Sequence, residues 1–493
     1  MGRGTDLPAH SAKPVRTTLP LGDFLPDKPP HAHPGLIACN NVIPRDGGYA
    51  PLKSFVASTN GTLPATCLGG AAFKSSSKRS FTYAGTASNI YVATISGWLS
   101  VGSGFTAGPD NMWRFEQFGD RCIASNGLDP VQSIPMTSTG VAAALKGKPP
   151  TMEILTTVRD FLVGGVIGGD ALTIEWSGIN NSEAWSPGTA QCDYNTFPVG
   201  GGVTGITGGE YGLVFQESRI SRMTYVGGNL IFQFDEISSN VGCIARRSIC
   251  RYGSLVFFLS SRGFMVCDGS SVTPIGDEKI DRTFAALGDM KNLGSMSSVV
   301  DPVNKLAIWS VPVTTGAPQQ WFIYHFTLGR WTTATQSTAF LMSGLSIDYT
   351  LEDLDAFGNV DTLTDSFDAG RWKGGIAGLY VIDGNNTLGT MTGPNSAATF
   401  TYPDMEPASG RSVRIRRMRP IIDATAGLTI TIAGKQRLGD ALVTTTHTTL
   451  QASGDMPTRR NCRSMRVGLG VAAATPWSFA QAIDMGAEIG SGR

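Results

Sequence analysis

The chain has 493 residues, more than the ~250–300 at which a single hydrophobic core usually stops growing, so we expect more than one domain. Its 41% hydrophobic and 16% charged residues exclude a disordered chain, and its 61 glycines, without a Gly-x-y repeat, exclude collagen. The 39 basic and 39 acidic residues give no overall attraction to nucleic acid or anionic membrane, and no run of 18 apolar residues predicts a membrane span. Glycines spread among short β-branched and aromatic runs indicate many tight turns, which predicts an all-β protein.

Residues 1–55 predict an extended, proline-rich arm. Nine of the 27 prolines lie in its first 51 residues, and proline lacks the N–H that a central strand or a helix interior needs. Leu21, Phe24, Leu36 and Val42 are apolar, so we expect the arm to pack against its own body or a neighbouring molecule. A disordered tail is the alternative.

Residues 56–400 repeat a polar turn that leads into a short apolar strand. The aligned residues Ile123, Val163, Val214, Val256 and Ile308 are 40, 51, 42 and 52 residues apart. A four-stranded propeller blade takes roughly 40–50 residues. We therefore expect a β-propeller-like body of about five to seven blades. A pair of β-sandwiches is the competing interpretation.

Residues 401–493 follow a different pattern, in which single apolar residues alternate with polar ones over at least four strands. Val413, Ile415, Leu428 and Ile430 begin this series. Alternation of this kind is typical of a strand with one buried face. The pattern predicts a C-terminal β-sandwich-like domain.

No catalytic, cofactor or metal site is predicted, so we expect a protein that is not an enzyme. The five histidines have no partners at metal-ligand spacing, and HExxH, GxSxG and Walker A patterns are absent from the sequence. Asp268 and Asp383 each precede a glycine, which favours turn aspartates bonded to their own backbone. The eight cysteines include no CxxC pair and are expected to be small buried side chains in a reducing cytoplasm. The tryptophans near strand ends are expected in the core rather than on a sugar-binding platform.

Two adjacent blocks carry opposite charge. Residues 341–410 hold ten acids against Arg371 and Lys373, a sum of −8, whereas residues 411–466 hold ten arginines and Lys435 against three aspartates, a sum of +8. Opposite patches on each copy suit a head-to-tail ring. The candidate inter-subunit arginines are Arg411, Arg414, Arg416, Arg417 and Arg419. A solvated sheet face and a DNA-binding face are the alternatives.

Five stretches spread along the chain carry a family resemblance. They are Leu19–Asp27, Phe118–Pro130, Trp176–Trp185, Ile220–Gly227 and Pro274–Arg282. The shorter motifs Pro34–Leu36, Asn40–Pro44, Gly48–Tyr49 and Gly490–Arg493 accompany them. Together they resemble the tail nozzle family of short-tailed phages, also called packaged-DNA stabilisation or head-completion proteins. None of the five is a catalytic signature, so the resemblance points to a family and not to a reaction.

The resemblance implies a structural virion protein, made in the host cytoplasm and located in the phage tail. In that family about six copies form a ring below the portal and adaptor, extend the DNA channel, retain the packaged DNA until ejection and dock fibres or spikes. Double-stranded DNA would pass through the lumen without sequence specificity, and an acidic wall would repel its phosphates and let it slide. The candidate lumen-facing acids are therefore Asp348, Glu352, Asp353, Asp355, Asp361, Asp365 and Asp368. The alternatives are another tail component, such as an adaptor or fibre-anchoring protein, and a glycan-binding or glycan-cleaving propeller on the virion.

Overall fold

The computed structural model describes residues 13–313, 319–345 and 377–489, except residues 32, 96 and 438. The expected all-β class is confirmed, because strands dominate this part of the chain. Its helical segments are α1 (Asp281–Leu287) and the 3-10 turns η1 (Arg246–Ser248) and η2 (Leu293–Ser295). In the same residues, no helix has the length and apolar character needed to cross a membrane.

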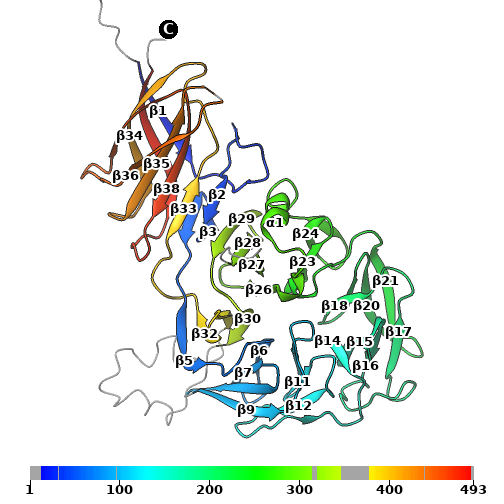
Figure 1. The fold of residues 1–493 in the computed structure, drawn as a ribbon. Helices are drawn as coiled ribbons and strands as arrows, with labels where there is room; N and C mark the ends of the chain where they lie inside the picture. Colours follow the sequence, from blue (N-terminus) through cyan, green and yellow to red (C-terminus); the bar gives the residue numbers. More distant parts are fainter. Residues whose placement is uncertain are drawn as a thin grey trace, which may run out of the picture.

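Six four-stranded antiparallel sheets and a four-stranded antiparallel part of a nine-stranded sheet make up the body of the described chain, and we number these as sheets 1 to 7 along the sequence (Figure 1). Sheets 1 to 4 contain β6 (Gly70–Lys74), β7 (Ser80–Gly85), β8 (Asn89–Thr94) and β9 (Gly97–Ser103); β10 (Arg114–Phe118), β11 (Arg121–Ser125), β12 (Gln132–Pro135) and β13 (Ala143–Ala144); β14 (Met152–Val158), β15 (Phe161–Ile167), β16 (Asp170–Trp176) and β17 (Asp193–Thr196); and β18 (Val203–Thr207), β19 (Gly212–Gln216), β20 (Ile220–Gly227) and β21 (Ile231–Ser238). Sheets 5 to 7 contain β22 (Cys250–Tyr252), β23 (Leu255–Ser260), β24 (Gly263–Cys267) and β25 (Val272–Pro274); β26 (Ser297–Asp301), β27 (Leu306–Val311), β28 (Gln320–His325) and β29 (Arg330–Thr335); and β30 (Phe340–Leu345), β31 (Ala377–Ile382), β32 (Thr387–Thr390) and β5 (Val56–Thr62).

The sheets follow one another around a common centre and form a closed circuit (Figure 1). First strands of neighbouring sheets contact each other at most junctions, as β10 does with β6 and β14, and β30 contacts β6 to complete the circuit. Sheets 4 and 5 meet through an apolar cluster that includes Phe215 and Phe258. Each pair of neighbouring sheets also shares a buried apolar cluster. The cluster between sheets 7 and 1 contains Leu63, Ala84, Met342 and Leu388. Burial of apolar side chains between neighbouring sheets therefore holds the body together.

The last sheet is completed by a strand from the start of the body. β5 pairs with β32, with Val56 opposite Thr390 and Thr62 opposite Thr387. The two ends of the body thus share one set of backbone hydrogen bonds, and the outer edge of β32 is covered.

The repeat seen in the sequence corresponds to one strand position. Ile123, Val163, Val214, Val256 and Ile308 lie on β11, β15, β19, β23 and β27, each the second strand of its sheet. The strands that precede the turn aspartates Asp268 and Asp383 differ in position, because β24 is the third strand of sheet 5 and β31 the second strand of sheet 7. Both strands end in an aspartate turn, but their places in the two sheets are not equivalent.

The C-terminal residues form two further sheets together with the arm, and we call this part the C-terminal unit. Sheet A contains β1 (Lys13–Pro20), β39 (Ala480–Ile489), β34 (Val413–Ile422), β37 (Met456–Cys462), β3 (Val42–Arg45) and β4 (Gly48–Pro51). Sheet B contains β2 (Ala38–Asn40), β33 (Ala398–Thr401), β38 (Ser464–Val471), β35 (Leu428–Lys435) and β36 (Val443–His447). Sheet B continues sheet 6, since β2 also pairs in parallel with β29.

The C-terminal unit draws on more of the chain than residues 401–493, and the arm packs against its own body. β1 runs antiparallel to β39, and β2 pairs with β33, which begins at Ala398. The physical reason is that the edges of β39 and β33 offer backbone N–H and C=O groups that the arm strands satisfy. Between the two sheets Ile415, Ile430, Val467 and Ile483 are buried in one apolar cluster.

Candidate functional site

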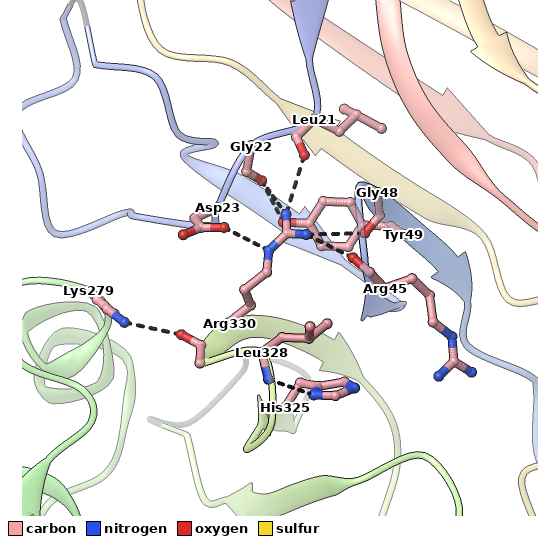
Figure 2. Close-up of polar contacts among 11 residues, drawn as sticks. Leu21, Gly22, Asp23, Arg45, Gly48, Tyr49, Lys279, His325, Leu328 and Arg330 are labelled. Atoms are coloured by element: carbon pink, nitrogen blue, oxygen red, sulfur yellow. Dashed lines mark hydrogen bonds and ion pairs between the residues drawn. The ribbon is translucent and has the colours of Figure 1, made fainter.

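Arg330 at the start of β29 joins the arm to sheet 6 (Figure 2). Its guanidinium donates from Nη2 to the carbonyl of Gly22 at 2.9 Å and from Nη1 to that of Arg45 at 3.0 Å, with longer contacts to two more arm carbonyls. Nε lies 2.7 Å from Oδ1 of Asp23, and the guanidinium carbon lies 4.6 Å from the ring centre of Tyr49. One side chain thus fixes several turns of the arm through charge-assisted hydrogen bonds and a cation–π contact.

Asp27 makes a second joint between the arm and the ring of sheets. Its carboxylate accepts hydrogen bonds from the backbone N–H groups of Arg282 and Thr283, both at 2.8 Å, and from the Thr283 hydroxyl at 2.7 Å. A carboxylate satisfies the free N–H groups of the first helical turn, here that of α1. The stretches Leu19–Asp27 and Pro274–Arg282, which carry part of the family resemblance, therefore meet in space.

Two other family-like stretches also contact each other. Arg121 lies 2.6 Å from the carboxylate of Glu183 and joins Phe118–Pro130 in sheet 2 to Trp176–Trp185 in sheet 3. Trp185 is buried, and its indole N–H donates to the carbonyl of Ser182 at 2.7 Å. The residues that carry the resemblance thus hold neighbouring sheets together.

The candidate inter-subunit arginines lie on or beside one strand at the surface of the C-terminal unit. Along β34, Val413, Ile415 and Met418 are buried, while Arg414, Arg416 and Arg419 are exposed and Arg417 is half-buried. A bulge between Ile415 and Arg417 lets both Arg416 and Arg417 reach the outer side of sheet A. Arg411 is exposed and lies in the bend before the strand.

Two of these arginines are paired within the chain. Arg416 lies 2.7 Å from a carboxylate oxygen of Glu488, and Arg417 lies 2.8 Å from one of Asp455. Arg414 and Arg419 make no ion pair within the described residues. These two are therefore the arginines of β34 whose charge is available to a partner.

Two arginines on the same outer face were missed by the sequence analysis. β39 runs between β1 and β34. Arg16 on β1 and Arg417 on β34 are therefore both partners of Gly486 on β39, one on each side. Together with Arg419, Asp455 and Asp484 they line a hollow of about 180 Å³. Pairing between strands at opposite ends of the chain leaves no local signal for Arg16.

Arg459 is the second arginine that was missed. It is exposed on β37, whose buried residues Met456 and Thr458 alternate with the exposed Pro457 and Arg459. This period-two pattern was visible in the sequence and could have placed Arg459 on the outer face.

The acidic block is only partly described. The candidate lumen-facing acids Asp348, Glu352, Asp353, Asp355, Asp361, Asp365 and Asp368 lie outside the described residues. Asp404, from the same block, is buried and pairs with Lys435 at 3.1 Å and with Arg466 at 2.9 Å. At this point the two charge blocks neutralise each other inside one chain.

The other aspartates, cysteines and tryptophans considered in the sequence lie in turns or in the hydrophobic core where they are described. Asp268 accepts hydrogen bonds from the N–H groups of Ser270 and Ser271, which hold the pKa of its carboxyl well below the usual range. Asp383 accepts hydrogen bonds from the N–H groups of Asn385 and Thr387 in its own turn. The eight cysteines are buried and free. Trp176, Trp185, Trp309, Trp321 and Trp331 are buried as expected, while Trp372 lies outside the described residues. The part of the chain that is described contains no group of three or more histidine, cysteine or acidic side chains placed to hold a metal ion.

Comparison with known proteins gives only distant similarity. No family model and no curated protein matches the chain. Among solved structures, the computationally designed Ika8 protein matches with a TM-score of 0.33 and 12% identity over 56% of this chain and 76% of its own. BamB from Moraxella catarrhalis matches with a TM-score of 0.35 and 10% identity over 76% of this chain and 97% of its own. The extracellular domain of a hybrid two-component system from B. thetaiotaomicron matches with a TM-score of 0.38 and 9% identity over 83% of this chain and 47% of its own.

Proposed function

We propose that this chain is a structural subunit of a short-tailed phage particle, in which copies form a ring that extends and closes the DNA exit channel. The resemblance of five stretches to the tail nozzle family supports this. So does the use of four of those stretches as joints, through Asp27 and through the Arg121–Glu183 pair. A subunit of a ring through which DNA is ejected needs a rigid shape more than it needs a reactive group.

The observation that carries the proposal is the arginine face of sheet A. It presents Arg16, Arg414, Arg416, Arg419 and Arg459 to solvent, and the acids Asp455, Asp484 and Glu488 lie among them. The surplus of positive charge suits the acidic surface of a neighbouring copy, and the hollow beside Gly486 has room for a carboxylate side chain. Two different complementary surfaces on each copy generate a head-to-tail ring.

The proposal includes a finer description of the fold. The seven sheets would be the blades of a β-propeller, with β5 closing the last blade, and sheets A and B would form a β-sandwich. The circular order of the sheets and the apolar cluster between each pair of neighbouring sheets support the propeller. The acids between residues 348 and 368 would face the DNA lumen or a neighbouring copy, while the tail adaptor and fibres or spikes would contact other surfaces.

Cryo-electron microscopy of phage particles that contain this chain tests the proposal. We expect a ring of about six copies around an axial channel at the far end of a short tail, with the arginine face of sheet A against a neighbouring copy. Trimers on the outside of the particle would contradict it. Incubation of the purified protein with host polysaccharide should release no new reducing ends, and their release would instead support a glycan-cleaving propeller.

A further inference from the structure

Charged side chains meet at the centre of the circuit of sheets. Arg114 begins β10 in sheet 2, Glu153 lies near the start of β14 in sheet 3, and Arg246 and Arg247 form η1 just before sheet 5. Sheets 2 and 5 are not neighbours in the circuit, yet Nη2 of Arg114 donates to the carbonyl of Arg246 at 3.4 Å. These side chains therefore reach across the middle of the ring, at the end where the first strands begin.

The positive charge at this centre is only partly balanced. Arg246 forms an ion pair with Glu153. The guanidinium of Arg247 has neither a hydrogen bond nor an ion pair among the described residues, and its Nη1 is buried. Burial, followed by the like charges of Arg114 and Arg246, lowers the pKa of Arg247 to about 9. Arg247 as a whole is half-buried, and a cation held partly away from water without an ion pair is costly, so this group gains from an anion that reaches it.

A cavity opens beside these groups. Its volume is about 350 Å³, and its lining includes Asp110, Asn111, Glu153, Arg246 and Arg247. The lining holds two guanidinium groups, those of Arg246 and Arg247, and two carboxylates, those of Asp110 and Glu153. Arg114 lies behind the lining against Arg246, so the cluster as a whole, though not the lining alone, carries one surplus positive charge. Asn111 adds an amide that can donate further hydrogen bonds.

We propose that this cavity binds a small tetrahedral oxyanion of the phosphate or sulfate class, held by Arg247 and Arg246. The planar fork of a guanidinium matches two oxygens of such an anion, and one anion supplies the partner that Arg247 lacks. The cavity is the size of a small ligand, and its lining comes from β14 and from the segments that precede β10, β22 and β26. This site goes beyond the proposed assembly role and does not depend on it.

Thermal unfolding of the full chain in phosphate and in chloride, at equal ionic strength and pH, tests the site. Wild-type protein should gain stability with phosphate in a saturable way, with Tm rising by about 2–3 °C at a hundredfold excess over Kd. Sulfate should act similarly, and isothermal titration with inorganic phosphate should give one site per chain. Equal Tm values in phosphate and chloride would overturn the proposal.

The variant Arg247→Gln separates an anion site from a structural arginine. In chloride it should be as stable as the wild type or more so, because it removes an unpaired, half-buried charge, and the phosphate-dependent rise in Tm should be lost. Arg262→Gln is the matched control, since Arg262 is exposed in the β23–β24 turn, and it should keep the full rise. A loss of stability in Arg247→Gln that is equal in phosphate and chloride would show a structural role and contradict the site.

Discussion

The joint at Arg330 gives a prediction whose size follows from its contacts. Arg330→Ala removes two well-formed hydrogen bonds to the carbonyls of Gly22 and Arg45, together with the cation–π contact to Tyr49. The Arg330 side chain is 12% exposed, so the carbonyls it leaves are poorly hydrated. Loss of a hydrogen bond to a charged donor costs about 1.5–3 kcal/mol and loss of the cation–π contact about 1 kcal/mol.

These contributions share one side chain and do not add fully, so we expect a loss of about 3–5 kcal/mol in the free energy that holds the arm. The ion pair with Asp23 contributes at most about 1 kcal/mol, because that carboxylate is 54% exposed. Arg330→Lys should restore the positive charge but not the planar guanidinium group, so the stability of its arm should lie between those of the wild type and Arg330→Ala.

Hydrogen exchange followed by mass spectrometry measures the effect where it should occur. Amides between Leu21 and Leu36 should exchange about a hundredfold faster or more in Arg330→Ala, while the strands of sheets 2 to 4 should keep their protection. Arg262→Ala, at an exposed turn, should change neither region. Unchanged exchange of the arm in Arg330→Ala would refute the idea that this guanidinium holds the arm to the body.

Three further predictions concern other parts of the molecule. Burial raises the pKa of Glu116 from 4.5 to about 7, so the free energy of unfolding should fall as the pH rises from about 4.5 to 7. In urea, Glu116→Gln should be about 1–3 kcal/mol more stable than the wild type at pH 8 and as stable as the wild type at pH 4. A variant that matches the wild type at both pH values would contradict this. The double variant Arg414→Glu/Arg419→Glu should abolish self-association of concentrated protein in about 10 mM salt, where screening is weak, and unchanged sedimentation would exclude this face as the seam. The eight buried thiols should react with Ellman's reagent only after unfolding in guanidinium, and rapid reaction of one of them in the folded chain would show that its region opens.

Part of this architecture could be predicted from the sequence because some strands have a clear local sequence pattern. Second strands such as β15 and β27 are long apolar runs that follow polar turns, and their spacing gave the period of the sheets. β34 and β35 show the alternation of a sheet with one buried face, which predicts Arg414 and Arg416 on the outer side. Arg417 and Arg419 reach that side only because of the bulge after Ile415, which the alternation does not predict.

Other elements could not be predicted, because their signal is short or lies far away in the chain. β22 has three residues and β13 has two, too few to show any period. The pairing of β5 with β32 joins segments more than 300 residues apart, and that of β1 with β39 joins the two ends of the chain. Arg16 therefore reaches the arginine face only through long-range pairing, and the cluster around Arg247 forms only when sheets 2, 3 and 5 close around one axis.

The joints and the arginine face act together if copies of this chain form a ring. A head-to-tail ring closes only when the rotation from one copy to the next divides a full turn, and an error in that angle accumulates around the ring. The arginine face belongs to the C-terminal unit, and the contacts of Arg330 and Asp27 help to set its angle to the seven sheets. Loosening either joint should therefore impair ring closure even when every arginine of sheet A is intact, which makes the arm an element of assembly geometry as well as of stability.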